Sequence, residues 1–236
     1  MEKKFNSFYS VAPMMGKTDS FFCYLMYLIN KNIKVYTEMM HANTILRTNI
    51  LEKYKGLDDL SNIAIQIAGN SPIYLAKAAK KASAYGFKEI NINCGCPSKN
   101  VIAGNFGLSL LLKPKIVKDC VEAVKSEVSS LVSVKTRIGI HNNDDNNQIL
   151  DNFINEINLS GVKKYILHAR NGILGNISTK KKLKIPPLKY ERVFKLKEKF
   201  YKNIIIINGG FVDTLTKNTY QHKIDGIMIG REAYKN

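Results

Sequence analysis

Residues 63–93 read IAIQIAGNSPIYLAKAAKKASAYGFKEININ, and the order of patterns in this stretch decides the fold class. Two short isoleucine-rich runs, Ile63–Ile67 and Glu89–Asn93, enclose a longer segment, Pro72–Tyr85. Small and apolar residues of that segment recur at three and four positions, as on one face of a helix: Leu75, Ala78, Ala79 and Ala82. Proline is harmless at the first helical position, where the N–H has no intrahelical partner. The stretch predicts two parallel strands joined by a crossover helix.

The same alternation of short strands and longer helices extends along the chain. The predicted strands are Tyr9–Ala12, Lys34–Thr37, Ile63–Ile67, Glu89–Asn93, Val132–Lys135, Lys164–His168, Ile204–Asn208 and Gly226–Ile229. The predicted helices are Ser20–Lys31, Pro72–Tyr85, Pro114–Ser129, Asn147–Leu159, Pro187–Phe200 and a shorter one near Leu215–His222. Eight strands that alternate with helices predict a (β/α)8 TIM barrel, an α/β fold of roughly 250 residues. The 236 residues therefore predict one domain spanning 1–236.

The charge balance indicates a polyanionic partner. There are 36 Lys and Arg residues against 19 Asp and Glu, which gives a formal net charge of +17. Phosphate backbones neutralise such an excess, so we expect binding to nucleic acid, with a compositional drift toward lysine and asparagine as the alternative. After the sixth predicted strand, residues 172–187 contain no strand and include Lys180 and Lys184, which predicts a long basic loop beside the site.

Cysteine spacing and hydropathy exclude other classes. None of the four cysteines belongs to a CxxC pair, which excludes a zinc ribbon, and we expect no metal site. No apolar run has the length of a signal peptide or of a membrane helix, which needs roughly 20 residues. We therefore expect an intracellular, cytoplasmic protein that is monomeric, binds no membrane and keeps its cysteines as thiols.

Polar residues close several predicted strands, and in this fold the strand ends meet at one mouth. Lys135, His168 and Asn208 each end an apolar run. After the last two strands come Gly209, Gly210, Gly230 and Arg231. Glycines let backbone N–H groups approach an anion, and these two loops commonly bind a cofactor phosphate in such barrels. The pattern predicts a phosphate site, although the glycines could also serve tight turns.

Other strand ends offer groups for a flat ring. Pro13, Met14 and Met15 follow the first strand, and Gln66 lies near the end of the third, where it could equally be a core side chain. Lys135 could form a Schiff base, pair with a carboxylate or stabilise negative charge on a flavin. His168 could donate to a cofactor or have a structural role.

A cysteine on a turn is the candidate proton donor. Cys96 lies in the sequence Gly95-Cys96-Pro97-Ser98, just after the fourth strand. A cysteine thiol is largely protonated near pH 7 and can act as a general acid. We expect Cys94 to be structural, and Cys23 and Cys120 to be core thiols on helices.

Taken together, these motifs resemble the tRNA-dihydrouridine synthase family over essentially the whole chain. The resemblance rests on Ala12-Pro13-Met14, Tyr36-Thr37-Glu38-Met39, Asn91-Ile92-Asn93-Cys94-Gly95-Cys96-Pro97-Ser98, Lys135-Thr136-Arg137-Ile138-Gly139, His168-Ala169-Arg170, Asn208-Gly209-Gly210 and Gly230-Arg231-Glu232-Ala233-Tyr234. The extended Lys135–Ile140 motif, Ile185-Pro186-Pro187-Leu188 and Arg231–Tyr234 are similar to the bacterial A-type branch, which modifies U20 and U20a of the tRNA D-loop.

The resemblance implies bound FMN, NADPH as the reductant, hydride transfer to C6 of a uracil and protonation of C5 by Cys96. It implies that FMN is held by Pro13, Met14, Met15, Gln66, Lys135, His168, Asn208, Gly209, Gly210, Gly230 and Arg231. It also implies that Asn93 contacts tRNA, and the basic side chains Arg137, Arg170, Lys180 and Lys184 are the further candidates for that contact.

Three alternatives and one departure accompany this interpretation. The chain could be another FMN-dependent barrel acting on a free pyrimidine, or a non-catalytic RNA-binding barrel. An aldolase-like barrel with a Lys135 Schiff base would contain no flavin. The family continues after the barrel into a helical domain that binds tRNA, and we expect this chain to lack both that domain and the last barrel helix, since it stops at Asn236.

Overall fold

The computed structural model describes residues 8–57, 59–174, 185–212, 220 and 222–235. Parallel strands form a closed barrel in which each strand pairs with its neighbour in sequence and the last pairs with the first. The strands are β1 (Phe8–Val11), β2 (Lys34–His41), β3 (Ile63–Ala68), β4 (Glu89–Cys94), β5 (Leu131–Arg137), β6 (Lys164–His168), β7 (Ile204–Asn208) and β8 (Gly226–Ile229). The predicted (β/α)8 barrel is confirmed, and all eight predicted strands are present.

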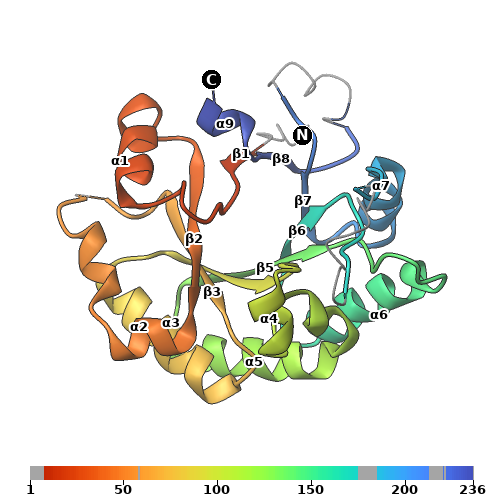
Figure 1. The fold of residues 1–236 in the computed structure, drawn as a ribbon, viewed down its shortest axis with the longest axis horizontal. Coiled ribbons are helices and arrows are strands. Elements are labelled where there is room, and N and C mark those ends of the chain that lie inside the picture. The colour runs from red at the N-terminus through yellow and green to blue at the C-terminus, as the bar shows by residue number, and fades with distance from the viewer. Residues whose placement is uncertain (1–7, 58, 175–184, 213–219, 221, 236) are drawn as a thin grey trace.

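Helices surround the barrel as a ring (Figure 1). The described helices are α1 (Ser20–Ile29), α2 (Ala42–Arg47), α3 (Pro72–Tyr85), α4 (Lys99–Ala103), α5 (Pro114–Glu127), α6 (Asn146–Asn158), α7 (Tyr190–Lys199) and α9 (Glu232–Lys235). Two 3-10 helices, η1 (Ile50–Tyr54) and η2 (Gly107–Leu112), lie in the connections. The helix predicted near Leu215–His222 lies mostly outside the described residues.

Several boundaries differ from the predicted ones. Strand β2 continues to His41 rather than ending at Thr37, with a register shift between Tyr36 and Met39. The helix predicted from Pro187 begins at Tyr190. The short helices α2 and α4 were not predicted, because five or six residues cover less than two helical turns and carry too little periodicity. After β8 the described chain contains the single helical turn α9.

The core has two parts because successive strand residues point to opposite faces of the sheet. On β6, Tyr165 and Leu167 belong to the large apolar layer between barrel and helices, whereas Ile166 belongs to the barrel interior. The interior apolar cluster consists of Ala12, Tyr36, Ala64, Ile166, Ile206 and Met228. A strand-end residue can reach the mouth of the barrel only if its position in this alternation faces the barrel interior.

Within the described ranges, none of the helices has the length and apolar character needed to span a membrane. The same part of the chain holds no group of three or more His, Cys, Asp and Glu side chains arranged for a metal ion. All four cysteines are free thiols, and Cys23, Cys94 and Cys120 are buried in the core as expected.

Candidate active site

A cavity of about 630 Å³ opens at the carboxyl ends of the strands. This volume is in the range of small-molecule and cofactor sites. Residues at or just beyond the ends of the strands line it: Ala12, Pro13, Met14, Met15, Met39, Gln66, Asn93, Gly95, Cys96, Pro97, Lys135, Thr136, Arg137, His168, Arg170, Ile185, Asn208, Gly209, Gly210, Phe211, Val212, Gly230, Arg231 and Glu232. All the described candidate residues therefore share one cavity, whereas Lys180 and Lys184 lie outside the described residues.

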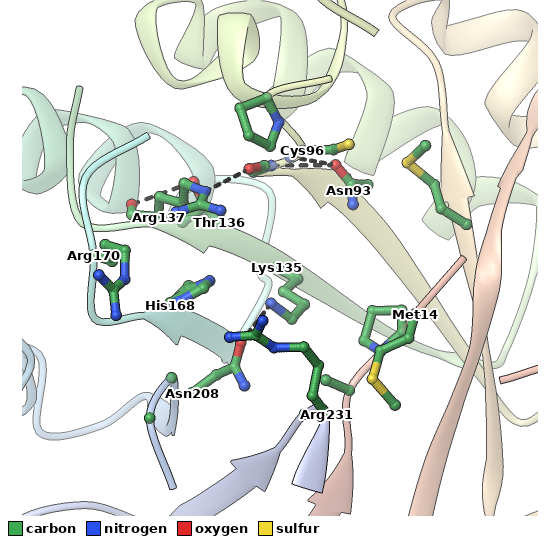
Figure 2. A pocket seen from close by; sticks show the side chains of 18 of the residues that line it. Met14, Asn93, Cys96, Lys135, Thr136, Arg137, His168, Arg170, Asn208 and Arg231 are labelled. Carbon is green, nitrogen blue, oxygen red and sulfur yellow. Dashed lines mark hydrogen bonds between the residues drawn. The ribbon is translucent and has the colours of Figure 1, made fainter. Parts of the chain in front are cut away.

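Strand alternation brings the polar candidates together. Along β5, Ser133, Lys135 and Arg137 occupy alternate positions, and β6 places His168 two residues after the interior Ile166. Adjacent register pairs align Arg137 with His168, and His168 with Asn208. The side chains accordingly converge on the mouth, as Figure 2 shows for Lys135, His168 and Asn208.

Lys135 lies at the centre of the cavity wall. Its Nζ donates a hydrogen bond to Asn208 Oδ1 at 3.0 Å, and Asn208 in turn donates to the Met228 carbonyl at 2.9 Å. Burial, followed by the nearby positive charge of Arg137, lowers the pKa of Lys135 to about 7. The charge of an anion bound in the cavity would act against this lowering and favour the charged form of Lys135.

His168 is neutral at physiological pH. Burial and the surrounding cations, first among them Lys135, lower the pKa of His168 to about 2. A neutral imidazole has one N–H donor and one acceptor nitrogen, so His168 can donate a single hydrogen bond into the cavity.

Two arginines at the rim connect neighbouring loops. Arg137 Nε donates to the Gly95 carbonyl at 2.9 Å, and Arg137 Nη1 donates to the Asn171 carbonyl at 3.4 Å. Arg170 donates to the Pro186 carbonyl. Both side chains line the cavity, so each guanidinium holds a loop with some donors and directs positive charge toward the cavity with the rest.

The turn after β7 requires glycine. Gly209 and Gly210 have φ values of 116° and 77°, in the region that favours glycine. A Cβ at Gly209 would lie 2.7 Å from His168 Cδ2, and one at Gly210 would lie 2.4 Å from Leu188 Cδ1. Gly230 differs, since an added Cβ there would meet no atom within 4 Å. The tight-turn interpretation thus fits the β7 loop, while Gly230 leaves open space next to Arg231.

The Cys96 turn is fixed by the end of β4. Asn93 Oδ1 accepts hydrogen bonds from the backbone N–H groups of Gly95 at 3.2 Å and Cys96 at 3.1 Å. The Cys96 carbonyl accepts from Leu108 N at 3.0 Å, and the Cys96 thiol lies 3.5 Å from Ser98 Oγ. Among the cysteines, Cys96 alone is not buried, and it lines the same cavity as Lys135 (Figure 2).

A sequence model of one enzyme family, described as dihydrouridine synthase, matches residues 10–236. The chain belongs to the dihydrouridine synthase family. The resemblance seen in the motifs is thereby confirmed.

Named relatives indicate which branch of the family the chain resembles most. The tRNA-dihydrouridine(20/20a) synthase of Shewanella oneidensis is 39% identical over 236 residues, which cover 99% of this chain and 69% of the relative. The enzyme of the same name from Synechocystis sp. is 37% identical over 227 residues, covering 96% of this chain and 68% of the relative. These relatives support the A-type branch for this dihydrouridine synthase family member.

Among solved structures, the fold is similar to that of histamine dehydrogenase from Rhizobium sp. 4-9, with a TM-score of 0.64. The sequences are 14% identical, and the match covers 96% of this chain and 44% of the other. At this identity the likeness shows the shared barrel fold.

Sequence reasoning missed two features of this family member's site. Met39 lines the cavity because β2 extends past Thr37. In addition, Glu89, Asn91 and Ser133 are buried polar residues inside the barrel. The signal for them was present, since Glu89, Asn91 and Asn93 occupy alternate positions of a strand that is otherwise isoleucine and cysteine.

Proposed function

We propose that this chain reduces a uridine of the tRNA D-loop, at U20 or U20a, to dihydrouridine with FMN as its cofactor and NADPH as the reductant. The observation that carries the proposal is the shared cavity, in which Cys96 and the cationic groups Lys135 and Arg231 surround one space of about 630 Å³. Family membership supports the reaction class.

The residues present fit a flavin with a phosphate. Lys135 and Arg231 make no ion pair with a carboxylate in the described part of the chain, so they are available to an anionic group. The β7 turn brings its backbone close to the cavity because Gly209 and Gly210 carry no side chain. Loops seven and eight of such barrels commonly bind cofactor phosphates.

The deeper wall of the cavity fits the polar edge of a flavin ring. Gln66 already donates to Asn91 at 2.7 Å and accepts from Asn93 at 2.8 Å, which leaves one N–H and one lone pair of its amide. Lys135 and His168 add further donors. When bound, reduced FMN would supply the hydride that saturates the uracil C5–C6 bond together with a proton.

Cys96 is our candidate for that proton donor. Its thiol lies at the rim where a nucleobase would enter, and its backbone is held by Asn93. Protonation at C5 converts the thiol to a thiolate, which solvent then reprotonates. Arg137, which donates to the Gly95 carbonyl, holds the same turn from the other side at 2.9 Å.

The surface charge fits an RNA substrate. A uracil inside folded RNA must leave its stack, which costs a few kcal/mol, and phosphate contacts of a basic protein offset that cost. The net charge of +17 supplies such contacts. Arg170 at the rim, together with Lys180 and Lys184 outside the described residues, is our candidate for part of them.

The test is dihydrouridine formation on unmodified tRNA with FMN and NADPH, read by mass spectrometry of fragments around position 20. Cys96→Ala should retain FMN and lose activity by about 100-fold or more, which is a typical contribution of a general acid. Cys120→Ala is the matched control, because that thiol is buried on α5, outside the cavity. Full activity of C96A would remove Cys96 from the mechanism, and no product from the unchanged protein would contradict the proposal.

A further inference from the structure

A continuous chain of hydrogen bonds runs through the barrel interior from the Cys96 turn to the opposite end of the strands. Its links measure 3.1, 2.8, 2.7, 2.8 and 2.7 Å. In order, they join Cys96 N to Asn93 Oδ1, Asn93 Nδ2 to Gln66 Oε1, Gln66 Nε2 to Asn91 Oδ1, Asn91 Nδ2 to Ser133 Oγ, and Ser133 Oγ to Glu89 Oε1.

The direction of every link is fixed from the mouth. The backbone N–H groups of Gly95 and Cys96 can only donate, so Asn93 must turn its carbonyl oxygen toward them. Its amino group is then left for Gln66, which in turn must offer its own oxygen and donate onward to Asn91. The same logic continues until a hydroxyl donates to the last acceptor.

That last acceptor fixes the direction independently. An ionised carboxylate can only accept, and Glu89 lies 2.8 Å from Lys164 Nζ and 3.7 Å from Lys34 Nζ. Burial opposes ionisation of Glu89, but the charges of Lys164 and Lys34, together with hydrogen bonds from Lys164 and Ser133, outweigh it and lower its pKa. Both ends of the chain therefore demand the same orientation of each amide between them.

Burial makes this orientation rigid. The side chains between the turn and the carboxylate are shielded from solvent, with exposed fractions of 7% for Asn93, 1% for Gln66, and 0% for Asn91 and Ser133. Flipping one amide would bring two donors or two acceptors face to face without water to replace the lost bond. A single link can therefore reverse only if its neighbours reverse as well.

We propose that Glu89 is a positioning residue for the Cys96 turn, which it orients through Ser133, Asn91, Gln66 and Asn93. The inference rests on the proposed role of Cys96 as proton donor. It assigns to a carboxylate at the far end of the barrel the task of holding the Asn93 oxygen toward the turn and the free part of the Gln66 amide toward the cavity.

A purely structural role of Glu89 makes a different prediction. If Glu89 only balances the charges of Lys164 and Lys34, the ion cluster suffices, and breaking the chain above it should leave the turn unchanged. Ser133→Ala makes that cut, because it removes the hydroxyl that connects Asn91 to Glu89 and keeps the ion pairs.

Ser10→Ala is the matched control. Ser10 is 2% exposed and lies on β1, two residues before the interior Ala12, and its hydroxyl has no hydrogen-bond partner among the described residues. The two variants lose the same atom from the inside of the same barrel. They differ in whether the lost hydroxyl belongs to the hydrogen-bond chain.

The readout is hydrogen exchange of the Gly95 and Cys96 amides, followed by NMR on the whole chain without substrate or cofactor. Ser133→Ala should speed their exchange by about tenfold, and Ser10→Ala should leave it unchanged. Ser133→Thr keeps the hydroxyl and should restore slow exchange. If Ser133→Ala does not fold, Ser133→Cys, a thiol with weak hydrogen bonding, should give a smaller increase in the same direction.

Equal exchange in Ser133→Ala, Ser10→Ala and the unchanged protein would overturn the inference. A second readout is kinetic: Ser133→Ala should lower kcat for tRNA with little change in KM, since the RNA-binding surface is intact. Exchange requires neither flavin nor RNA. If the protein forms no dihydrouridine but Ser133→Ala speeds amide exchange, the proposed function alone is contradicted. If the protein forms dihydrouridine but Ser133→Ala leaves exchange unchanged, the positioning role alone is contradicted.

Discussion

The floor and the mouth of the barrel both gather charged side chains, but only the floor neutralises its charges. At the floor, one carboxylate, Glu89, lies against the ammonium groups of Lys164 and Lys34 and accepts hydrogen bonds from Tyr36 and Ser133. The mouth gathers four cations around one cavity: Lys135, Arg137, Arg170 and Arg231. Across the described ranges, none of these four forms an ion pair with a carboxylate.

The difference separates a structural site from a ligand site. Neighbouring lysines lower the pKa of Glu89 despite its burial, so its charged form is the stable one. Lys135 shows the opposite balance, because burial and Arg137 lower its pKa to about 7. A cluster that destabilises its own charges gains most from a bound anion, which is why the mouth and not the floor is our candidate site.

The largest effect should come from removing the floor carboxylate. Glu89→Leu leaves the buried Lys164 and the half-buried Lys34 without the carboxylate that they share, and we expect the free energy of unfolding to fall by about 3–5 kcal/mol. Urea denaturation at pH 7 measures it. Glu127→Leu is the control, since Glu127 pairs with Lys80 at 2.8 Å on the surface, and it should cost less than about 1 kcal/mol. Equal costs would mean that the floor pairs contribute no more than a surface pair.

Replacing a lysine by methionine should change the free energy of unfolding in opposite directions at the mouth and at the floor of the barrel. Lys135→Met removes an uncompensated charge and should raise the free energy of unfolding by on the order of 1–3 kcal/mol at pH 6. Lys164→Met removes a partner of Glu89 and should lower it. Flavin binding should weaken only in the first variant. If both variants lose stability, the mouth cation is already compensated and the contrast fails.

The pH dependence gives that prediction its sign. Unfolded, Lys135 is protonated up to its ordinary pKa near 10.4, whereas folded it is protonated only below about 7. Between these values the unfolded state binds an extra proton at Lys135, so the contribution of this residue to stability falls as the pH falls from about 10.4 to 7 and then levels off. The advantage of Lys135→Met should therefore be greatest below pH 7 and vanish above about pH 10.4, as urea titrations at pH 6, 8 and 10 would show.

The fold was predictable because its strands carry strong local signals. Runs such as Ile63–Ala68 and Ile204–Asn208 are short, apolar and bounded by turn residues, and each became a barrel strand. Strand β2 was predicted too short because Glu38 interrupts its apolar run. In the structure that glutamate accepts a hydrogen bond from the backbone N–H of Gly16, a contact between the first two strand ends that no local pattern encodes.

The membership of the cavity was predictable, but its internal bonding was not. Strand alternation and the convergence of strand ends suffice to gather Lys135, His168 and Asn208. Their hydrogen-bond partners depend on how segments that are far apart in sequence pack against one another. Arg137 illustrates this: its place at the strand end was predictable, but the hydrogen bonds that it donates to the Gly95 and Asn171 carbonyls were not.

The smallest expected effect is the stabilisation of the protein by an anion bound at the mouth. Inorganic phosphate at ten times its Kd should stabilise the protein by about 1.4 kcal/mol, because it binds the folded state alone. With the phosphate concentration held at its pH 6 value, the gain should shrink as the pH rises through 7, where Lys135 loses its proton. Arg231→Gln should remove most of the gain, whereas Arg47→Gln, an exposed residue of α2 outside the cavity, should keep it. Thermal unfolding scans compare the variants. A gain that is equal in both and independent of pH would place the phosphate elsewhere, and the four mouth cations would then have no demonstrated anion.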